Sequence, residues 1–393
     1  MIAESIFEIR ELPFINDVKA KGGKIYECGG AVRDSFLGKP SKDLDILITN
    51  ILVDELYDIL KTYGKVDTVG ASFGVIKFKP FGSSEDIDIA IPRTERKIGE
   101  GHKGFEITAD PFLPIEEDLF RRDFTINAMA KDLEGNLIDP YNGLDDLNNK
   151  IIRVLSEQSF NDDPLRMLRC VMFSARFNFV IEPYTLELIP KNAYRIKEIS
   201  PERILIELEK IVSKGNPAIG AELLVKTGLY EHIFEGRLEI VSEAFKEIKS
   251  FAEFIFLLNN RRVDTFKFFL KNLKGDTITA KEIEALTMIS YYNTNLSEGD
   301  NRMRVFNALQ KSQSIIDTKI CVVGMKKILR EFACGKYPKS RKELAVNGSD
   351  IEALGFSGVE IGEQLSNILF KILNDKLKNN KEEILNMLKL EKC

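Results

Sequence analysis

Two pairs of aspartates stand in strand-like segments of the chain, KDLDILI and EDIDIAI. Side chains two positions apart project from the same face of a β-strand, so Asp43 and Asp45 are predicted to lie together, with Asp88 arriving from a neighbouring strand. Clustered carboxylates repel one another unless a cation neutralises them, and Mg²⁺ is usually held by carboxylates together with substrate phosphates. The spacing therefore predicts a divalent-metal site. Asp86 shares a face with Asp88, so spacing alone leaves the third carboxylate open between these two.

A glycine pair ends the apolar run at 25–28, thirteen residues before the first aspartate pair. Gly29 and Gly30 let backbone amides approach an anion closely, because no Cβ stands in the way. Arg33 and Lys42 add positive charge to the same segment. The dinucleotide-binding fingerprint and the P-loop need other spacings, which this segment lacks. The segment therefore predicts a phosphate-binding turn next to the metal site.

The elements that must position these groups fall into two regions of different pattern. Up to about residue 150, helical patterns such as ILVDELYDILKTYG alternate with strand-like runs at 25–28, 44–48, 75–78 and 87–91. Beyond about residue 151 the strand signals vanish, and apolar residues recur every three or four positions. Ser200 followed by proline indicates a helix start, Gly215 and Gly228 indicate helix ends, and a final helix is expected at 370–390. The pattern predicts an α/β head joined to an all-helical remainder.

Composition sets the outer bounds of this interpretation. The chain has 393 residues, 44% of them hydrophobic and 30% charged, which is typical of two to four packed globular modules. The N-terminal segment has no signal-peptide core, and no run approaches the roughly 18 apolar residues that span a bilayer. A cytoplasmic protein is expected. The five cysteines are scattered and never form a C-x-x-C pair, so neither a disulfide framework nor a zinc site is indicated.

One basic run stands out against the net charge of −5. The segment 319–342 carries eight lysines and arginines against the single acid Glu331. Such a run could cover RNA phosphates, helped by Phe332 and Tyr337, although a solvated helix face would look the same. The RNA-binding candidates are Lys326, Lys327, Arg330, Lys336, Lys339, Arg341 and Lys342.

A glycine pair followed after about a dozen residues by D-x-D resembles the opening of the nucleotidyltransferase superfamily with a polymerase-β-like palm. Four further segments in order, EDLFRRDFTINAMA, DPYNGLDDLNNKIIRV, DDPLRMLRCVMFSARFNF and SPERILIELEKI, resemble the motifs of class II tRNA nucleotidyltransferases and bacterial poly(A) polymerases. The resemblance covers about 24–211 closely and the remainder loosely. It implies an α+β fold: a palm with a small mixed sheet, then an all-helical neck, body and tail. The expected divisions are a head at 1–150, a neck at 151–215, a body at 216–300 and a tail at 301–393.

The resemblance implies template-independent addition of the 3′-terminal CCA to tRNA from CTP and ATP. An RNA 3′-hydroxyl would attack the α-phosphate of the incoming nucleotide, with release of pyrophosphate. Two Mg²⁺ ions would be held by Asp43, Asp45 and Asp88, since the resemblance favours Asp88 over Asp86. The expected partners are the tRNA 3′ end, through acceptor stem and elbow, and the two nucleotides. The protein is expected to be a monomer or weak dimer without a membrane association.

Further nucleotide-binding residues follow from the same resemblance. Gly29, Gly30 and Arg33 correspond to positions at the triphosphate, and Arg122 to a residue that contacts the nucleotide. Asp123 and Asn127 could read the ribose hydroxyls, which would favour NTP over dNTP. Asn127 has an equal alternative as a helix-cap or core amide. Arg121 is expected to hold its motif in place.

The segment DDPLRMLR predicts how the base is selected. Asp163 and Arg166 lie one helical turn apart and can present an acceptor beside a donor fork. A carboxylate accepts from the amine of cytosine or adenine, whereas guanine and uracil carry a carbonyl there and lose about 1–3 kcal/mol per mispaired contact. An exposed ion pair is the plainer alternative. The chain departs from the family in two respects: Asp162 stands where a glutamate is usual, and Met172 stands where a further arginine is common, while Arg169 is retained.

The segment between the palm strands and RRDFTINA is long and contains Gly99, Gly101 and Gly104, which predicts a mobile loop. In the family such a loop is associated with switching from CTP to ATP, so its presence favours full CCA addition. The alternatives are an A-adding enzyme, a CC-adding enzyme or a poly(A) polymerase on the same scaffold. An RNA-binding protein with an inactive head is a different class of answer, and the intact Asp43, Asp45 and Arg33 argue against it.

Overall fold

The structure is a computed structural model. It describes residues 9–39, 44–67, 74–84, 86–97, 105–234, 243–262, 264–290, 295–321 and 323–392. The chain divides into two compact units: the first comprises 1–200 with 223–233, and the second 201–222 with 234–393.

The first unit is built on a seven-stranded mixed sheet with the order β3-β4-β5-β2-β1-β8-β9. Its strands are β1 (Lys24–Cys28), β2 (Asp45–Thr49), β3 (Gly64–Asp67), β4 (Val75–Pro80), β5 (Ile87–Ala90), β8 (Ala130–Asp132) and β9 (Leu137–Ile138). The pairing of β2 with β5 is parallel, and every other pairing in this sheet is antiparallel. The mixed sheet of an α+β fold is therefore confirmed.

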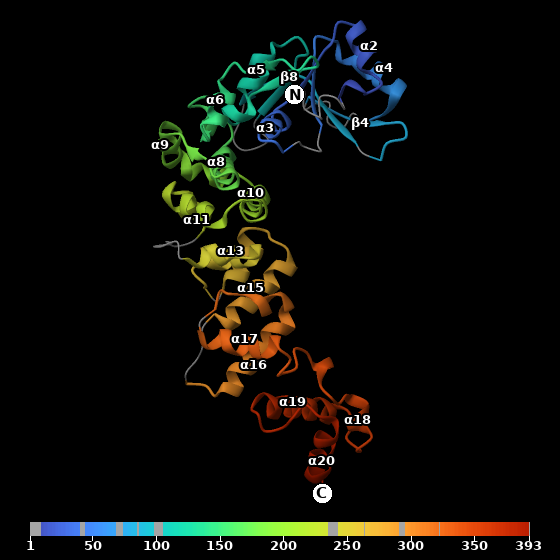
Figure 1. Ribbon diagram of the computed structural model, residues 1–393, viewed down its shortest axis with the longest axis vertical. Helices are drawn as coiled ribbons and strands as arrows, with labels where there is room; N and C mark the ends of the chain where they lie inside the picture. Colours follow the sequence, from blue (N-terminus) through green and yellow to red (C-terminus); the bar gives the residue numbers. More distant parts are fainter. Residues whose placement is uncertain are drawn as a thin grey trace. The chain divides into compact units, whose positions relative to one another are not determined.

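Alternation of apolar and polar residues decides which face of each strand is buried. One face carries Ile46, Ile76, Phe78 and Ile89 into the main core of this unit. Helices α2 (Ile15–Ala20) and α4 (Val53–Tyr63) lie beside that sheet in Figure 1. The opposite face is covered only in part, by a smaller cluster at the β1–β8 side that contains Cys28, Leu47, Leu119 and Ala130.

The segment predicted as one mobile loop is more regular than expected. Its described parts form an antiparallel hairpin of β6 (Arg93–Lys97) and β7 (Phe105–Ala109), followed by helix α5 (Ile115–Phe120). The three glycines of the predicted loop lie outside the described residues. Period-2 alternation was too weak in this short, charged stretch to reveal the hairpin.

The remainder of the first unit is mostly helical. After the 3₁₀ turn η2 (Thr125–Asn127) come α6 (Gly143–Asn148), α7 (Ser159–Asp162), α8 (Leu165–Phe177), α9 (Pro183–Asn192), the 3₁₀ segment η3 (Ala193–Glu198) and α12 (Leu229–Ile233). The prediction that strands end near residue 151 was wrong in detail, because β10 (Ile151–Ile152) pairs in parallel with β11 (Val180–Ile181). Two residues are too few for a periodicity signal.

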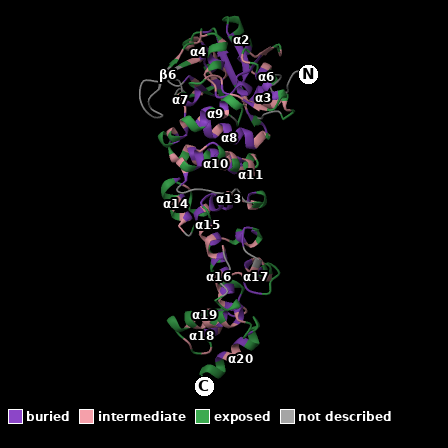
Figure 2. Ribbon diagram, turned by 90° about the vertical axis from the view of Figure 1, so that its left-hand side faces the viewer, coloured by how far each residue is buried: buried purple, intermediate pink, exposed green. Residues whose placement is uncertain are grey.

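The second unit is helical throughout its described residues. Its helices are α10 (Pro201–Lys214), α13 (Phe251–Leu258), α14 (Thr265–Asn272), α15 (Thr277–Ile289), α16 (Glu298–Lys311), α17 (Val323–Ala333), α18 (Gly348–Glu352), α19 (Val359–Leu373) and α20 (Lys381–Lys392), with α11 (Pro217–Lys226) crossing the division between the units. The helix start at Ser200 and the ends near Gly215 and Gly228 are confirmed. The single final helix at 370–390 is wrong: α19 ends at Leu373, Asp375 takes a positive φ, and α20 begins only at Lys381. Figure 2 shows much exposed surface on these last helices. None of the helices described is long and apolar enough to cross a membrane.

Candidate active site

Two of the predicted metal-binding carboxylates are neighbours in the sheet. Asp45 opens β2, Asp88 lies in β5, and the parallel register pairs their Cα positions. Paired positions on adjacent strands point to the same face, so both carboxylates stand on the face opposite the main core. Both side chains are exposed, and Asp88 is 3.8 Å from Lys77. Asp43 lies outside the described residues.

The structure separates Asp86 from Asp88, which spacing could not do. Asp86 precedes β5 and lies 3.8 Å from Lys79. Only Asp88 is in register with Asp45. The register therefore favours Asp88 as the third carboxylate.

The glycine pair connects the end of β1 to helix α3 (Gly30–Phe36). It lies close to Asp45, the first residue of β2. Gly29 has φ +67° and ψ −123°, a conformation that side chains rarely adopt. A Cβ at this position would also clash with Nη1 of Arg122. A Cβ on Gly30 would stand 3.8 Å from Oδ2 of Asp45. The turn thus brings the N-terminus of α3 next to Asp45.

Gly29→Ala is expected to lower activity far more than a comparable glycine change elsewhere. The backbone strain costs about 1–2 kcal/mol, and the new methyl group must also displace Arg122. Gly38→Ala is the matched control, because Gly38 has φ +68° but open space around its Cβ position. We expect a loss of thermal stability in both variants, larger in Gly29→Ala because of the clash with Arg122, and a loss of nucleotide affinity only in Gly29→Ala. Equal nucleotide dissociation constants would show that Arg122 need not occupy this place.

Arg33 is held from three sides and is only 4% exposed. Its Nε donates to Oδ1 of Asp34 at 2.7 Å, and its Nη1 donates to Oδ1 of Asn127. The guanidinium also lies over the rings of Phe173 and Phe177 on α8, at 5.3 and 5.0 Å. Burial lowers the pKa of Arg33, and Asp34 opposes that shift. Arg33 therefore fixes the α3 turn against α8 and brings a buried positive charge beside the site.

Asp123 and Asn127 form one buried network with Arg169. Oδ2 of Asp123 accepts from Nη2 and Nε of Arg169 at 2.6 and 2.9 Å, and its Oδ1 accepts from Nδ2 of Asn127 at 2.8 Å. Burial raises the pKa of Asp123, but Arg169 and Asn127 lower it more, so the net pKa lies below its ordinary value. Asn127 is a buried polar link between Arg33 and Asp123.

The two arginines of the RRD motif share one buried acid, Asp118. Arg121 Nε donates to Asp118 Oδ1 at 2.8 Å, and Arg122 Nη2 lies 3.4 Å from Oδ2. The backbone carbonyl of Arg121 also accepts from Arg166 on α8. Sequence reasoning missed Asp118, although its spacing of three and four residues from the arginines is the signal that could have found it.

The predicted base-selecting pair stands at the start of α8. Asp163 lies just outside the helix, and its Oδ1 accepts from the backbone N–H of Leu165 at 3.1 Å. Arg166 donates to Oγ of Ser159 at 2.9 Å and to the Arg121 carbonyl. These contacts fix Arg166 between the RRD motif and α7. Met172 is buried, whereas Arg176, one turn later, reaches Asp34 at 3.4 Å and brings a further positive charge toward α3.

The basic candidates of the second unit are less uniformly positive than the sequence suggested. Lys327 pairs with Glu298 at 2.9 Å, and Lys336 lies 3.5 Å from Glu331 and 4.0 Å from Asp375. Arg330 is exposed, and a hollow of about 470 Å³ is lined by Lys326, Lys327, Arg330, Glu331 and Cys334. Lys339, Arg341 and Lys342 lie on the segment after α17, with Arg341 donating to Ser366.

The aromatic part of that prediction was wrong. Phe332 is fully buried and Tyr337 is 3% exposed, and the two rings pack 5.5 Å apart. Tyr337 donates to Asp375 at 2.7 Å and lies under the guanidinium of Arg302. These rings form part of the core of the second unit, so neither can stack on an RNA base.

Comparison with known families gives three matches in chain order. The model described as "Poly A polymerase head domain" matches 25–153, "Probable RNA and SrmB-binding site of polymerase A" matches 178–240, and the model for tRNA nucleotidyltransferase domain 2 matches 243–388. The chain belongs to the class II tRNA nucleotidyltransferase and poly(A) polymerase family. The family resemblance predicted from the motifs is thereby confirmed.

Curated relatives and solved structures agree with this family. The chain is 40% identical over 214 residues to a CCA-adding enzyme of Blochmanniella floridana, covering 54% of this chain and 50% of the relative. It is 42% identical over 206 residues to the multifunctional CCA protein of Tolumonas auensis, covering 51% and 48%. The chain thus spans about half the length of the curated relatives it matches. The Bacillus stearothermophilus CCA-adding enzyme in complex with CTP superposes with a TM-score of 0.66 at 27% identity, covering 99% and 98%.

The carboxylates that the structure describes fit a divalent cation. Asp45 and Asp88 are adjacent, exposed and on one face, and carboxylate oxygens are the ligands that hard divalent ions prefer. Membership of this nucleotidyltransferase family implies that the protein uses a divalent metal ion. The observed register supplies two oxygen-bearing groups where such an ion would be needed.

Proposed function

We propose that this protein adds the 3′-terminal CCA to tRNA without a template, using CTP and ATP and releasing pyrophosphate. The observation that carries the proposal is the parallel register of Asp45 with Asp88 beside the Gly29–Gly30 turn. Such an arrangement places metal-binding oxygens next to a phosphate-accepting turn, which is what nucleotidyl transfer requires. Relatives named for CCA addition support the choice of this reaction.

Two Mg²⁺ ions held by Asp43, Asp45 and Asp88 would neutralise the triphosphate and lower the pKa of the attacking hydroxyl. The chain's own residues do the rest. The Gly29–Gly30 turn leaves room for the triphosphate, and the buried charge of Arg33 favours its approach. Catalysis then comes from positioning and charge neutralisation, because phosphoryl transfer needs little covalent chemistry from the protein.

In this proposal Asp163 and Arg166 recognise the base of the incoming nucleotide. Its ribose is positioned by the network of Asp123, Asn127 and Arg169. Hydrogen bonds to the RRD motif hold Arg166, Asn127 and Arg169 in place. Arg122 completes the nucleotide pocket behind Gly29.

The head, neck, body and tail divisions at 1–150, 151–215, 216–300 and 301–393 are part of the same proposal, with the tail holding the tRNA acceptor stem and elbow. Lys326, Lys327, Arg330, Lys336, Lys339, Arg341 and Lys342 would contact phosphates there. We place the reaction in the cytoplasm and expect a monomer or weak dimer.

The test uses purified protein, Mg²⁺ and three tRNA transcripts that end before CCA, after C or after CC. Each is supplied with CTP, ATP or both, and the products are resolved at single-nucleotide length. Extension of all three to one finished CCA end is expected. Addition of A alone, of C alone or of long A tails would assign the protein to an A-adding enzyme, a CC-adding enzyme or a poly(A) polymerase instead.

Asp163→Ala is expected to lower kcat/KM for CTP and ATP by roughly 10–100-fold, because one mispaired contact is worth about 1–3 kcal/mol. The ratio of kcat/KM for CTP or ATP to that for UTP or GTP is expected to fall as well. Asp162→Ala is the control, since Asp162 is the neighbour at the end of α7. Single-nucleotide incorporation with each of the four NTPs measures the effect. If the Asp163 variant kept its preference for C and A, the base would be read elsewhere.

A further inference from the structure

We propose that the outer face of β4 binds the single-stranded 3′ end of the RNA, with Lys77 and Lys79 on its phosphates and Phe81 stacked on a terminal base. The inference rests on the proposed function and deepens it by assigning the surface that the RNA end occupies. No motif resemblance and no base-selection argument involves these three residues.

The sheet register fixes where the two lysines point. Lys77 on β4 is paired with Asp88 on β5, which is itself paired with Asp45 on β2. The three side chains therefore form a row across one face of the sheet. Lys79 is two residues further along β4 and shares that face, where it lies 3.8 Å from Asp86. Ile76 and Phe78, the residues that alternate with them, are fully buried in the main core.

Strand order places these lysines on the side of the carboxylates away from the nucleotide. The order β4-β5-β2-β1 puts Lys77 at one end of the row and the Gly29–Gly30 turn, which follows β1, at the other. In a nucleotidyl transfer the attacking and leaving oxygens lie in line on opposite sides of the phosphorus. With the triphosphate at the turn, the attacking RNA end must approach from the β4 side.

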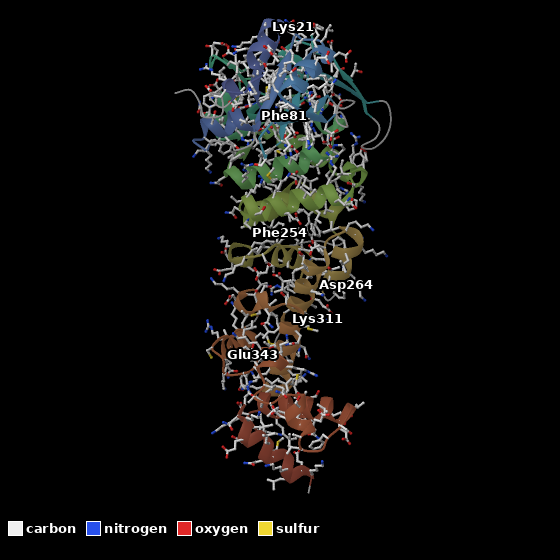
Figure 3. The ribbon with its side chains drawn as sticks, turned by 90° about the vertical axis from the view of Figure 1, so that its right-hand side faces the viewer. Lys21, Phe81, Phe254, Asp264, Lys311 and Glu343 are labelled. Carbon is white, nitrogen blue, oxygen red and sulfur yellow. The ribbon has the colours of Figure 1, made fainter. Side chains whose placement is uncertain are left out.

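The chemistry of the strand fits a single-stranded nucleic acid. Proteins bind single strands by combining positive charge along the backbone with aromatic rings on which bases stack. Lys77 and Lys79 are 59% and 42% exposed at their side chains, and Phe81, labelled in Figure 3, is 67% exposed directly after the strand. The turn that carries Phe81 is held by its backbone N–H, which donates to the Tyr63 carbonyl at 2.9 Å. The backbone that carries the ring is held in place, so stacking on a base would not require a loop to become ordered.

The charges around Lys77 and Lys79 on this face of the sheet link RNA binding to the binding of metal and nucleotide at the neighbouring carboxylates. In the described structure Lys77 lies 3.8 Å from Asp88 and is also in register with Asp67 on β3, and Lys79 lies 3.8 Å from Asp86. Such exposed pairs are worth less than about 1 kcal/mol and exchange readily. A divalent ion on Asp88 would cancel one of the two negative charges beside Lys77, which favours contact of that ammonium group with a phosphate.

The binding test compares Lys77→Ala/Lys79→Ala with a matched double variant, Lys21→Ala/Lys61→Ala. The control also removes two exposed lysines from ion pairs, with Glu55 at 3.3 Å and Asp58 at 3.6 Å. Binding of a tRNA ending after CC is measured by fluorescence anisotropy, with Ca²⁺ in place of Mg²⁺ to prevent turnover, across a range of salt. The β4 variant is expected to bind roughly tenfold more weakly, with a salt slope smaller by about 1.4, since each single-strand phosphate contact contributes about 0.7.

Stacking is measured with 2-aminopurine as the terminal nucleotide of the same tRNA, because stacking quenches its fluorescence. Wild-type protein is expected to quench the signal, Phe81→Ala to quench it less, and Phe81→Trp to restore quenching. The affinity for CTP in the absence of tRNA should be the same in all variants. Unchanged affinity shows that the head is still correctly folded in each of them.

Equal salt slopes for the β4 and control variants, together with unchanged quenching in Phe81→Ala, would overturn the inference. If those results were obtained and the wild-type protein still extended tRNA normally, only the inference would fail and the proposed function would be retained. Wild-type protein that neither binds nor extends any of the tRNA transcripts would instead overturn the proposed function and the inference together.

Discussion

Replacing Asp45 or Asp88 with asparagine is expected to lower kcat for CMP and AMP addition by roughly 10³-fold or more. Each amide keeps the size of the side chain but removes a negative charge from adjacent positions on one sheet face. Metal-assisted transfer depends on that charge to hold the cation against the triphosphate. Both side chains are exposed, so the variants should keep the thermal stability of the wild type. Single-turnover extension of a tRNA ending after CC measures the rate.

The matched control for this prediction is Asp86→Asn. Asp86 is equally exposed and equally close to a lysine, but it lies before β5 and out of register with Asp45. Its variant is expected to stay within a few-fold of wild type. A large loss in Asp86→Asn with little loss in Asp88→Asn would move the third ligand to Asp86. The metal assignment fails altogether if Asp45→Asn retains activity.

Replacing Asp123 with alanine is expected to cost about 3 kcal/mol of unfolding free energy, as well as activity. The change leaves Arg169 without its buried partner and Asn127 without an acceptor. Removing one member of a buried ion pair typically costs about 3–5 kcal/mol, and the lower end applies because Arg169 is 30% exposed. Chemical denaturation measures the loss, with the transition of the first unit followed separately where two transitions appear.

Asp264→Ala serves as the control for that ion pair. Asp264 pairs with Arg262 at 3.1 Å on the surface, with both side chains about half exposed, so less than about 1 kcal/mol is expected. A loss in Asp123→Ala no larger than in this control would mean that the buried network contributes little to stability.

The low pKa of Asp123 also predicts a pH dependence. A carboxyl group whose pKa is lower in the folded state contributes stability that is fully present above its unfolded pKa, near 3.8, and is lost as pH falls through the folded value. The difference in stability between wild type and Asp123→Asn should therefore be constant from about pH 7 to pH 5 and shrink below about pH 4. A difference that grew on acidification would contradict the lowered pKa.

The features of this protein that depend on local pattern could be predicted from its sequence. Alternation over four or five residues identified the strands that carry Asp45 and Asp88, and the glycine pair identified the turn before α3. Helix starts and ends at Ser200, Gly215 and Gly228 were also predictable. These features follow from side-chain period and backbone freedom, which act between residues close in the chain.

Contacts between residues far apart in the chain could not be predicted in this way, because they depend on how the whole chain packs. The parallel register that selects Asp88 over Asp86 joins strands about 40 residues apart, and no local pattern encodes it. Burial of Arg33 against α8 depends on a contact between segments far apart in the chain. In the second unit, Glu298 on α16 and Asp375 in the turn after α19 contact lysines of the basic run, and Phe332 and Tyr337 lie in the core. Packing decides these outcomes because a side chain's burial and its partners are set by everything around it, whereas its spacing in the sequence reports only its own element.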